Sequence, residues 1–191
     1  HSGYNAGLGW WSNRFGYGTP GAKAAVIHVH RNNWKTVRIY AAADGNVYFF
    51  LNGALERVVK DTQFMDGVIR VGNNCRDYQY RNLVLKGGDA PSAPAKVTKI
   101  AMASNVWTAN RYAAFKSNVL TIKSGSNFVE TKASFVRPLD MTIDMRQVSG
   151  SPECGVVAMF PNNRGRHSGY NAGLGWWSNR FGYGTPGAKA A

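Results

Sequence analysis

The first 25 residues of the chain occur again, without a mismatch, 166 positions later. Residues 1–25 and 167–191 both read HSGYNAGLGWWSNRFGYGTPGAKAA. Chance does not produce an identity of this length in a segment rich in Trp, Tyr and Gly, and self-similarity at a fixed period is typical of tandem arrays. The sequence therefore predicts a window cut from an array with a 166-residue period, in which neither His1 nor Ala191 needs to be a domain boundary.

Two engineered arrangements would also give this duplication. One is a circular permutant with a duplicated segment, and the other is a switch in which two copies compete for one position. A natural array is favoured because residues 87–98 have the Pro, Ala and Gly content of an ordinary inter-domain linker, without a tag or a Gly-Ser spacer.

The fold class is predicted to be all-β. Hydrophobic residues make up 44% of the chain and charged residues 17%, which is a globular composition, and helical periodicity is nearly absent. Asp44-Gly45 and Asn52-Gly53 are strong hairpin signals, because both central residues of a type I′ turn need a positive φ. One short helical turn is expected over residues 21–26. Strands are expected over residues 4–11, 15–18, 34–41, 46–51, 68–71, 79–85, 119–123, 128–136, 139–145 and 154–160.

A linker is predicted over residues 87–98, where Pro91 and Pro94 cannot donate to a sheet ladder. Residues 1–86 are then the C-terminal part of one repeat, and residues 99–191 are the N-terminal part of the next. Two assemblies remain open. The two parts complete one sandwich within the chain, or neighbouring repeats exchange strands and complete each part.

Charge indicates the kind of partner. The chain carries a net charge of +13, and one period carries +11, because the second copy adds Arg180 and Lys189 and no acidic residue. A polymer of such units is a polycation suited to acidic polysaccharide or cell-surface glycan, although the charge could equally serve only to limit self-association. The basic residues are scattered, so a nucleic-acid site is not expected. No apolar run has the length of a membrane span.

Two cysteines, Cys75 and Cys154, are available in each period. Their spacing does not fit a zinc site, and no metal or cofactor is expected. A disulfide is the favoured interpretation and implies an extracellular or cell-surface location, with two buried free thiols as the alternative. Pairing within one repeat and pairing between consecutive repeats both remain open.

The order of the expected strands resembles the concanavalin A-like (laminin G-like) jelly roll. The residues that carry the resemblance are WKTVRIY at 34–40, DGNVY at 44–48 and LNG at 51–53. The segments 66–72 and 80–85 are similar to closing strands of the 3-keto-disaccharide hydrolase-like branch, and 139–143 and 154–157 stand where opening strands belong. The resemblance implies a jelly-roll sandwich, here repeated every 166 residues.

An enzymatic function is not expected, in spite of the resemblance. A retaining glycosidase needs two carboxylates about 5 Å apart. Asp140 and Asp144 share one strand face but lie four residues apart, which is roughly 13 Å along a strand. They are interpreted as outward, solvated positions, and Glu130 and Glu153 have no acidic neighbour at a useful spacing.

The duplicated segment is the predicted site. Aromatic faces stack on sugar rings, and Asn and Arg hydrogen-bond to hydroxyl and carboxylate groups. The same side chains could instead pack in the core or against a neighbouring repeat. The candidates for carbohydrate binding or inter-repeat packing are Tyr4, Asn5, Trp10, Trp11, Asn13, Arg14, Phe15, Tyr17, Tyr170, Trp176, Trp177 and Arg180.

Three functions are carried forward. The first is a structural repeat unit of an extracellular filament or giant surface adhesin, whose main partners are copies of itself. The alternative is a lectin-like, carbohydrate-binding module that acts by multivalency. The second alternative is a glycoside-processing enzyme.

Overall fold

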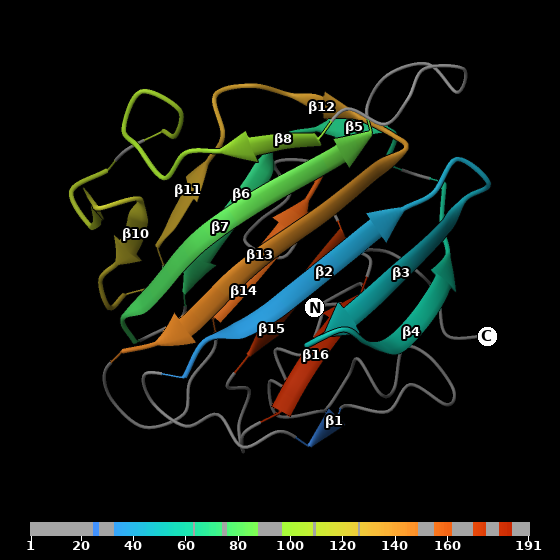
Figure 1. Ribbon diagram of the computed structural model, residues 1–191, viewed down its shortest axis with the longest axis horizontal. Helices are drawn as coiled ribbons and strands as arrows, with labels where there is room; N and C mark the ends of the chain where they lie inside the picture. The colour runs from blue at the N-terminus through green and yellow to red at the C-terminus, as the bar shows by residue number, and fades with distance from the viewer. Residues whose placement is uncertain are drawn as a thin grey trace.

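The fold is all-β, and every strand pair is antiparallel, as the sequence predicts (Figure 1). Within the residues that the structure describes there are sixteen strands and no helix, so none of these residues lies in a membrane-spanning helix. The description of 25–26, 170–174 and 180–184 covers the backbone and the side chain of Ala172. The computed structural model describes residues 25–26, 33–62, 64–73, 76–87, 97–108, 110–125, 127–148, 155–161, 170–174 and 180–184.

The larger sheet has eight strands in the order β4-β3-β2-β13-β7-β10-β9, and β8 also pairs with β7. It forms the front layer in Figure 1. Its strands are β2 (Lys35–Ala41), β3 (Asn46–Leu51), β4 (Ala54–Lys60), β7 (Tyr78–Gly87), β8 (Val97–Ile100), β9 (Ala113–Lys116), β10 (Val119–Ile122) and β13 (Leu139–Gln147).

The second sheet has six strands in the order β1-β16-β15-β14-β6-β11 and lies behind the first in Figure 1. A third sheet pairs β5 (Asp66–Gly67) with β12 (Phe135–Val136). The six strands are β1 (Ala25–Val26), β6 (Ile69–Asn73), β11 (Phe128–Glu130), β14 (Gly155–Met159), β15 (Tyr170–Leu174) and β16 (Arg180–Gly184).

Strand β13 is the central element of the larger sheet. Leu139, Met141, Ile143 and Met145 alternate with polar residues and are buried, as the sequence pattern predicts. One edge of β13 pairs with β2 along seven residues, and the other edge pairs with β7. Because β2 and β7 precede the predicted linker and β13 follows it, the two parts of the chain complete one sheet together.

The two larger sheets share one core. A single cluster of buried side chains includes Ile39 and Phe49 from the eight-stranded sheet and Val71 and Val157 from the six-stranded sheet. Tyr80 on β7 is fully buried, and its hydroxyl donates to the carbonyl of Gly72 on β6. A buried hydroxyl needs a partner, so this hydrogen bond fixes one sheet against the other.

A buried arginine joins the two parts of the chain a second time. Arg137 is 8% exposed, and its guanidinium donates to the carbonyls of Ala42 (2.5 Å), Asp61 (2.7 Å) and Asn46 (3.0 Å). All three acceptors precede the predicted linker. The five donors of a guanidinium suit such a set of diverging carbonyls.

Both predicted hairpins are confirmed. Gly45 (φ +92°) connects β2 to β3, and Asn52 (φ +50°) and Gly53 (φ +85°) connect β3 to β4. The Asp44 carboxylate accepts from the backbone N–H of Asn46 at 2.9 Å. This hydrogen bond fastens the first turn.

The Asp44 turn predicts a small dependence of stability on pH. The hydrogen bond from the Asn46 N–H lowers the pKa of Asp44 below its ordinary value. A lowered folded-state pKa means that the stabilisation is present above the ordinary pKa and is lost as pH falls through the folded pKa. Thermal melts between about pH 5 and pH 2 should show a weaker pH dependence for Asp44→Asn, which keeps the acceptor but does not titrate. Identical curves for the two proteins would contradict this.

Three sequence-based expectations need correction. The expected strand 128–136 is interrupted: β11 ends at Glu130 and β12 starts at Phe135, because the hydroxyl of Thr131 donates to the carbonyl of Ala133 and bends the chain. The expected helical turn 21–26 is wrong at residues 25–26, whose backbone pairs with β16 as a strand. The last two residues of the predicted linker, Val97 and Thr98, belong to β8, which pairs with β7.

Candidate functional site

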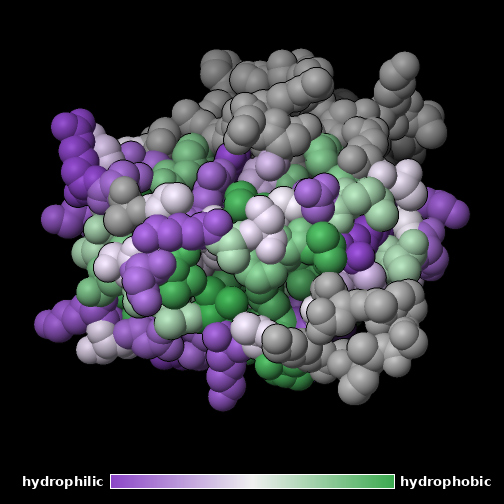
Figure 2. Space-filling view, turned by 90° about the horizontal axis from the view of Figure 1, so that it is seen from above, coloured by the Kyte–Doolittle hydropathy of each residue, from purple (hydrophilic) through white to green (hydrophobic). Residues whose placement is uncertain are grey.

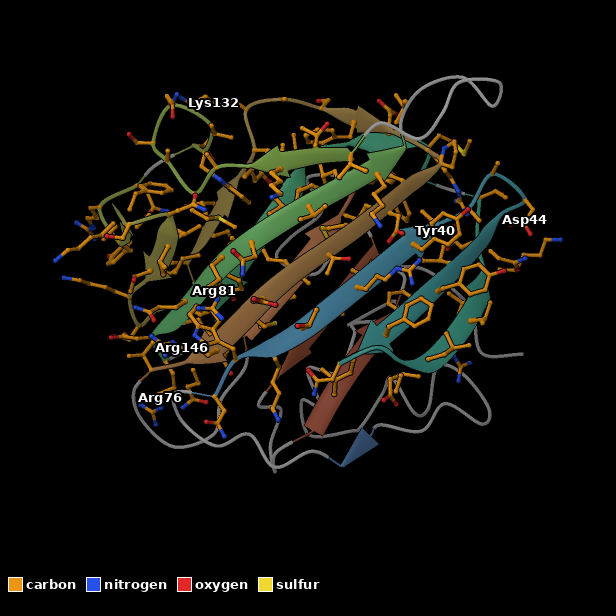
Figure 3. All side chains as sticks on the ribbon, viewed as in Figure 1. Tyr40, Asp44, Arg76, Arg81, Lys132 and Arg146 are labelled. Carbon is orange, nitrogen blue, oxygen red and sulfur yellow. The ribbon has the colours of Figure 1, made fainter. Side chains whose placement is uncertain are left out.

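The outer face of the eight-stranded sheet is the described surface with the densest set of aromatic and basic side chains. On β2, β3 and β13 every second residue is buried, so the residues between them point away from the core. This face is turned towards the viewer in Figure 3, and no described strand lies over it.

Two cross-strand rows, here called the aromatic rows, occupy the part of this face on β2, β3 and β4. In the first row Tyr40 lies opposite Tyr48, and Tyr48 lies opposite Val58. The two tyrosine rings stack with their centroids 5.6 Å apart. Cross-strand aromatic pairs of this kind stabilise a sheet, and they also present a flat apolar surface.

The second row places Arg38 opposite Phe50, and Phe50 opposite Leu55. The guanidinium carbon of Arg38 lies 4.5 Å from the centre of the Phe50 ring. Arg38 also forms a two-pronged ion pair with Asp140, at 2.7 and 2.9 Å. The hydrogen bond to Asp140 raises the pKa of Arg38 above its usual value. Leu55 and Val58 are 53% and 42% exposed, so both rows end in solvent-facing apolar side chains.

A second cluster, here called the Trp34 corner, lies where β7 and β13 meet the start of β2. The guanidinium carbons of Arg81 and Arg146 lie 4.0 and 4.4 Å from the centre of the Trp34 ring. The Nε of Arg146 donates to the Gln79 side chain at 2.8 Å. Contact with the indole holds both cations in fixed positions on one corner of the face, where Figure 3 labels them.

The outward carboxylates of β13 are engaged by donors. Asp140 is paired with Arg38 as described above. Asp144 accepts from the Thr36 hydroxyl at 2.8 Å, from the Asn82 amide at 2.9 Å and from the Arg81 Nε at 3.3 Å. The prediction that Asp140 and Asp144 face outward is confirmed, but their side chains are only 17% exposed. The face therefore offers flat rings and positive charge, whereas its two acids are neutralised by neighbours.

No metal site is found among the described side chains. They contain no group of three or more His, Cys, Asp or Glu residues placed to hold an ion.

The predicted site lies almost entirely outside the described residues, and so do Cys75 and Cys154. Tyr170 and Arg180 lie at the starts of β15 and β16, where the backbone alone is described. Binding by the duplicated segment and the disulfide both remain predictions. The candidates outside the described residues are Tyr4, Asn5, Trp10, Trp11, Asn13, Arg14, Phe15, Tyr17, Trp176 and Trp177.

An apolar edge is exposed beside the predicted linker. Met65, Val97 and Val136 are 51%, 58% and 48% exposed, and they belong to or adjoin β5, β8 and β12. These strands lie together at the top of Figure 1, and the view from above shows apolar surface along this side, bordered by hydrophilic side chains (Figure 2). The linker residues 88–96 connect two strands that meet at this edge, because Lys86 pairs with Val97.

Comparison with known proteins does not extend the assignment. No protein-family model matches the chain, and no curated protein matches it. The class that the structure defines is an all-β protein with a large antiparallel sheet.

Proposed function

We propose that the chain is a structural repeat unit of an extracellular filament or giant surface adhesin, in which each period of sequence folds into one jelly-roll sandwich, here called a bead. The observation that carries the proposal is the position of β13 between β2 and β7. Because residues from both sides of the linker share this sheet, about one period of sequence supplies a body with a common core.

The duplicated segment and the charge support the same proposal. Strands β15 and β16 lie in the second copy of the duplicated segment and extend the six-stranded sheet beyond β14. A perfect repeat makes every interface between neighbouring beads the same, as a regular polymer requires. The charge of +11 per period keeps such a polymer from collapsing on itself and attracts acidic cell-surface polymers.

Electron microscopy of the native material tests this proposal. We expect a regular fibre or string in which the mass of one axial repeat equals that of 166 residues. Free monomers, or material without any axial repeat, would overturn the structural role.

A second function, carbohydrate binding, is supported by the aromatic rows and the Trp34 corner. Stacked tyrosines offer a surface for the apolar faces of sugar rings, and fixed guanidinium groups pair with carboxylate or sulfate substituents. The proposed ligand is an acidic polysaccharide. Repetition of a weak site along an array would then give avidity.

Substitutions at the two clusters test the binding proposal. Tyr48→Ala removes one stacking ring worth about 1 kcal/mol, so affinity for polygalacturonate should fall about fivefold in calorimetry. Arg81→Ala should also weaken binding, whereas Lys132→Ala, which removes the same charge at the opposite end of the face (Figure 3), should not. Equal effects of Arg81→Ala and Lys132→Ala would mean that net charge alone attracts the polymer.

A further inference from the structure

The free edge of β16 is the place where the two copies of the duplicated segment meet. Strand β1 pairs with β16, with Ala25 opposite Phe181 and Val26 opposite Arg180 (Figure 1). Ala25 is the last residue of the first copy, whereas β16 lies in the second copy. The pairing therefore joins a position that ends one copy to a strand inside the other.

The period of the sequence gives this pairing a specific meaning. Ala25 is equivalent to Ala191, which follows Phe181 by ten positions. In a continuous array, position 26 of the next period follows Ala191 directly. An antiparallel pair between positions ten apart is a local hairpin, which short connections favour. The register seen between β1 and β16 is thus one that the chain could make with its own next residues.

We propose that the edge of β16 binds the residues that directly follow it in the array, so that the partner of this surface is the start of the next period. This inference rests on the proposed structural function. Each bead then runs without interruption from β8 of one period to β7 of the next. The boundary between beads lies in residues 88–96, and consecutive beads do not exchange strands.

The lengths of the two connections favour this boundary. A body of about one period has a diameter of roughly 40 Å, which approximates the distance between equivalent points on touching beads. Residues 185–190 separate Gly184 from Ala191 and span at most about 25 Å. Residues 88–96 reach about 35 Å and contain Pro91 and Pro94, which suit an extended joint. The longer, Pro-containing segment is the one that can pass from bead to bead.

The exposed edge described above lies at the same joint. Gly87 and Val97 are the last and first strand residues on either side of residues 88–96, and Met65 and Val136 are exposed nearby. The proposal therefore places this apolar edge where one bead leaves off and the next begins.

Cleavage at Lys96, followed by native mass spectrometry, tests the inference. In the native array, a cut at every Lys96 should release folded monomers that each have the mass of one period. If β16 instead paired with a strand of a different period, each fragment would span two beads, and the cut array would remain polymeric. That result would overturn the inference while leaving the structural role intact.

The 191-residue chain supplies the control for this experiment. Here the two parts share one sheet, so a cut at Lys96 should leave two fragments in a one-to-one complex. Separation of the fragments would contradict the pairing of β13 with β2 and β7. Native material without an axial repeat before cleavage would overturn both the structural role and the inference.

Discussion

Replacing Arg137 with Ala is expected to unfold much of the protein at room temperature. The substitution leaves the carbonyls of Ala42, Asn46 and Asp61 without the donors that they have now. Each buried acceptor left unsatisfied costs about 1–3 kcal/mol, so the total loss should be at least about 3 kcal/mol. That is a large share of the roughly 5–15 kcal/mol that stabilises a typical domain.

Chemical denaturation followed by circular dichroism measures this effect. Arg137→Lys should be intermediate, because an ammonium keeps the charge but cannot reach three diverging carbonyls in the same way. Arg111→Ala is the matched control: Arg111 is exposed, and its loss should change stability by less than about 0.5 kcal/mol. A stable Arg137→Ala protein would show that Arg137 does not join the two parts of the chain.

Adding a methyl group at Gly155 is expected to have the second-largest effect. A Cβ at Gly155 on β14 would overlap the ring of Tyr78, which is fully buried on β7. Neither group has free space to move into, since β14 is paired on both sides. Gly155→Ala should therefore destabilise the protein by about 1–3 kcal/mol, which is typical of overpacking.

A double-mutant cycle identifies the cause of that loss. Tyr78→Ala alone should be destabilising, because it leaves a large cavity. In Tyr78→Ala the added methyl group meets no ring, so Gly155→Ala should cost little or nothing in that background, and the two changes should not add. Strictly additive losses would mean that the strain at Gly155 comes from elsewhere.

Local patterns predicted the elements that depend on local chemistry. The hairpins at Gly45 and Gly53 follow from turn chemistry alone, and the buried face of β13 follows from strict alternation. Strands β4 and β9 were missed. The sequence ALERVVK of β4 does not alternate, and AAFK of β9 is too short to show a period. These two strands take their conformation from the neighbours with which they pair.

The aromatic and basic face was also missed, although part of its signal was available. Alternation over 34–41 and 46–51 already places Arg38, Tyr40, Tyr48 and Phe50 on outward positions. What a single sequence does not give is the register that sets Tyr40 beside Tyr48, or the approach of Arg81 and Arg146 to Trp34 from two other strands. These contacts depend on pairings between strands about 45 to 110 positions apart, which no local pattern encodes.

Native-state hydrogen exchange of the 191-residue chain tests most directly whether one period of sequence forms one self-contained body. If it does, the central amides of β2, β7 and β13 should exchange through a single global opening with a common free energy, and denaturant should lower that free energy equally for all three strands. Fast exchange of β13 beside protected β2 and β7 would show that residues 33–87 fold without the second part of the chain. That result would contradict a repeat unit built from both.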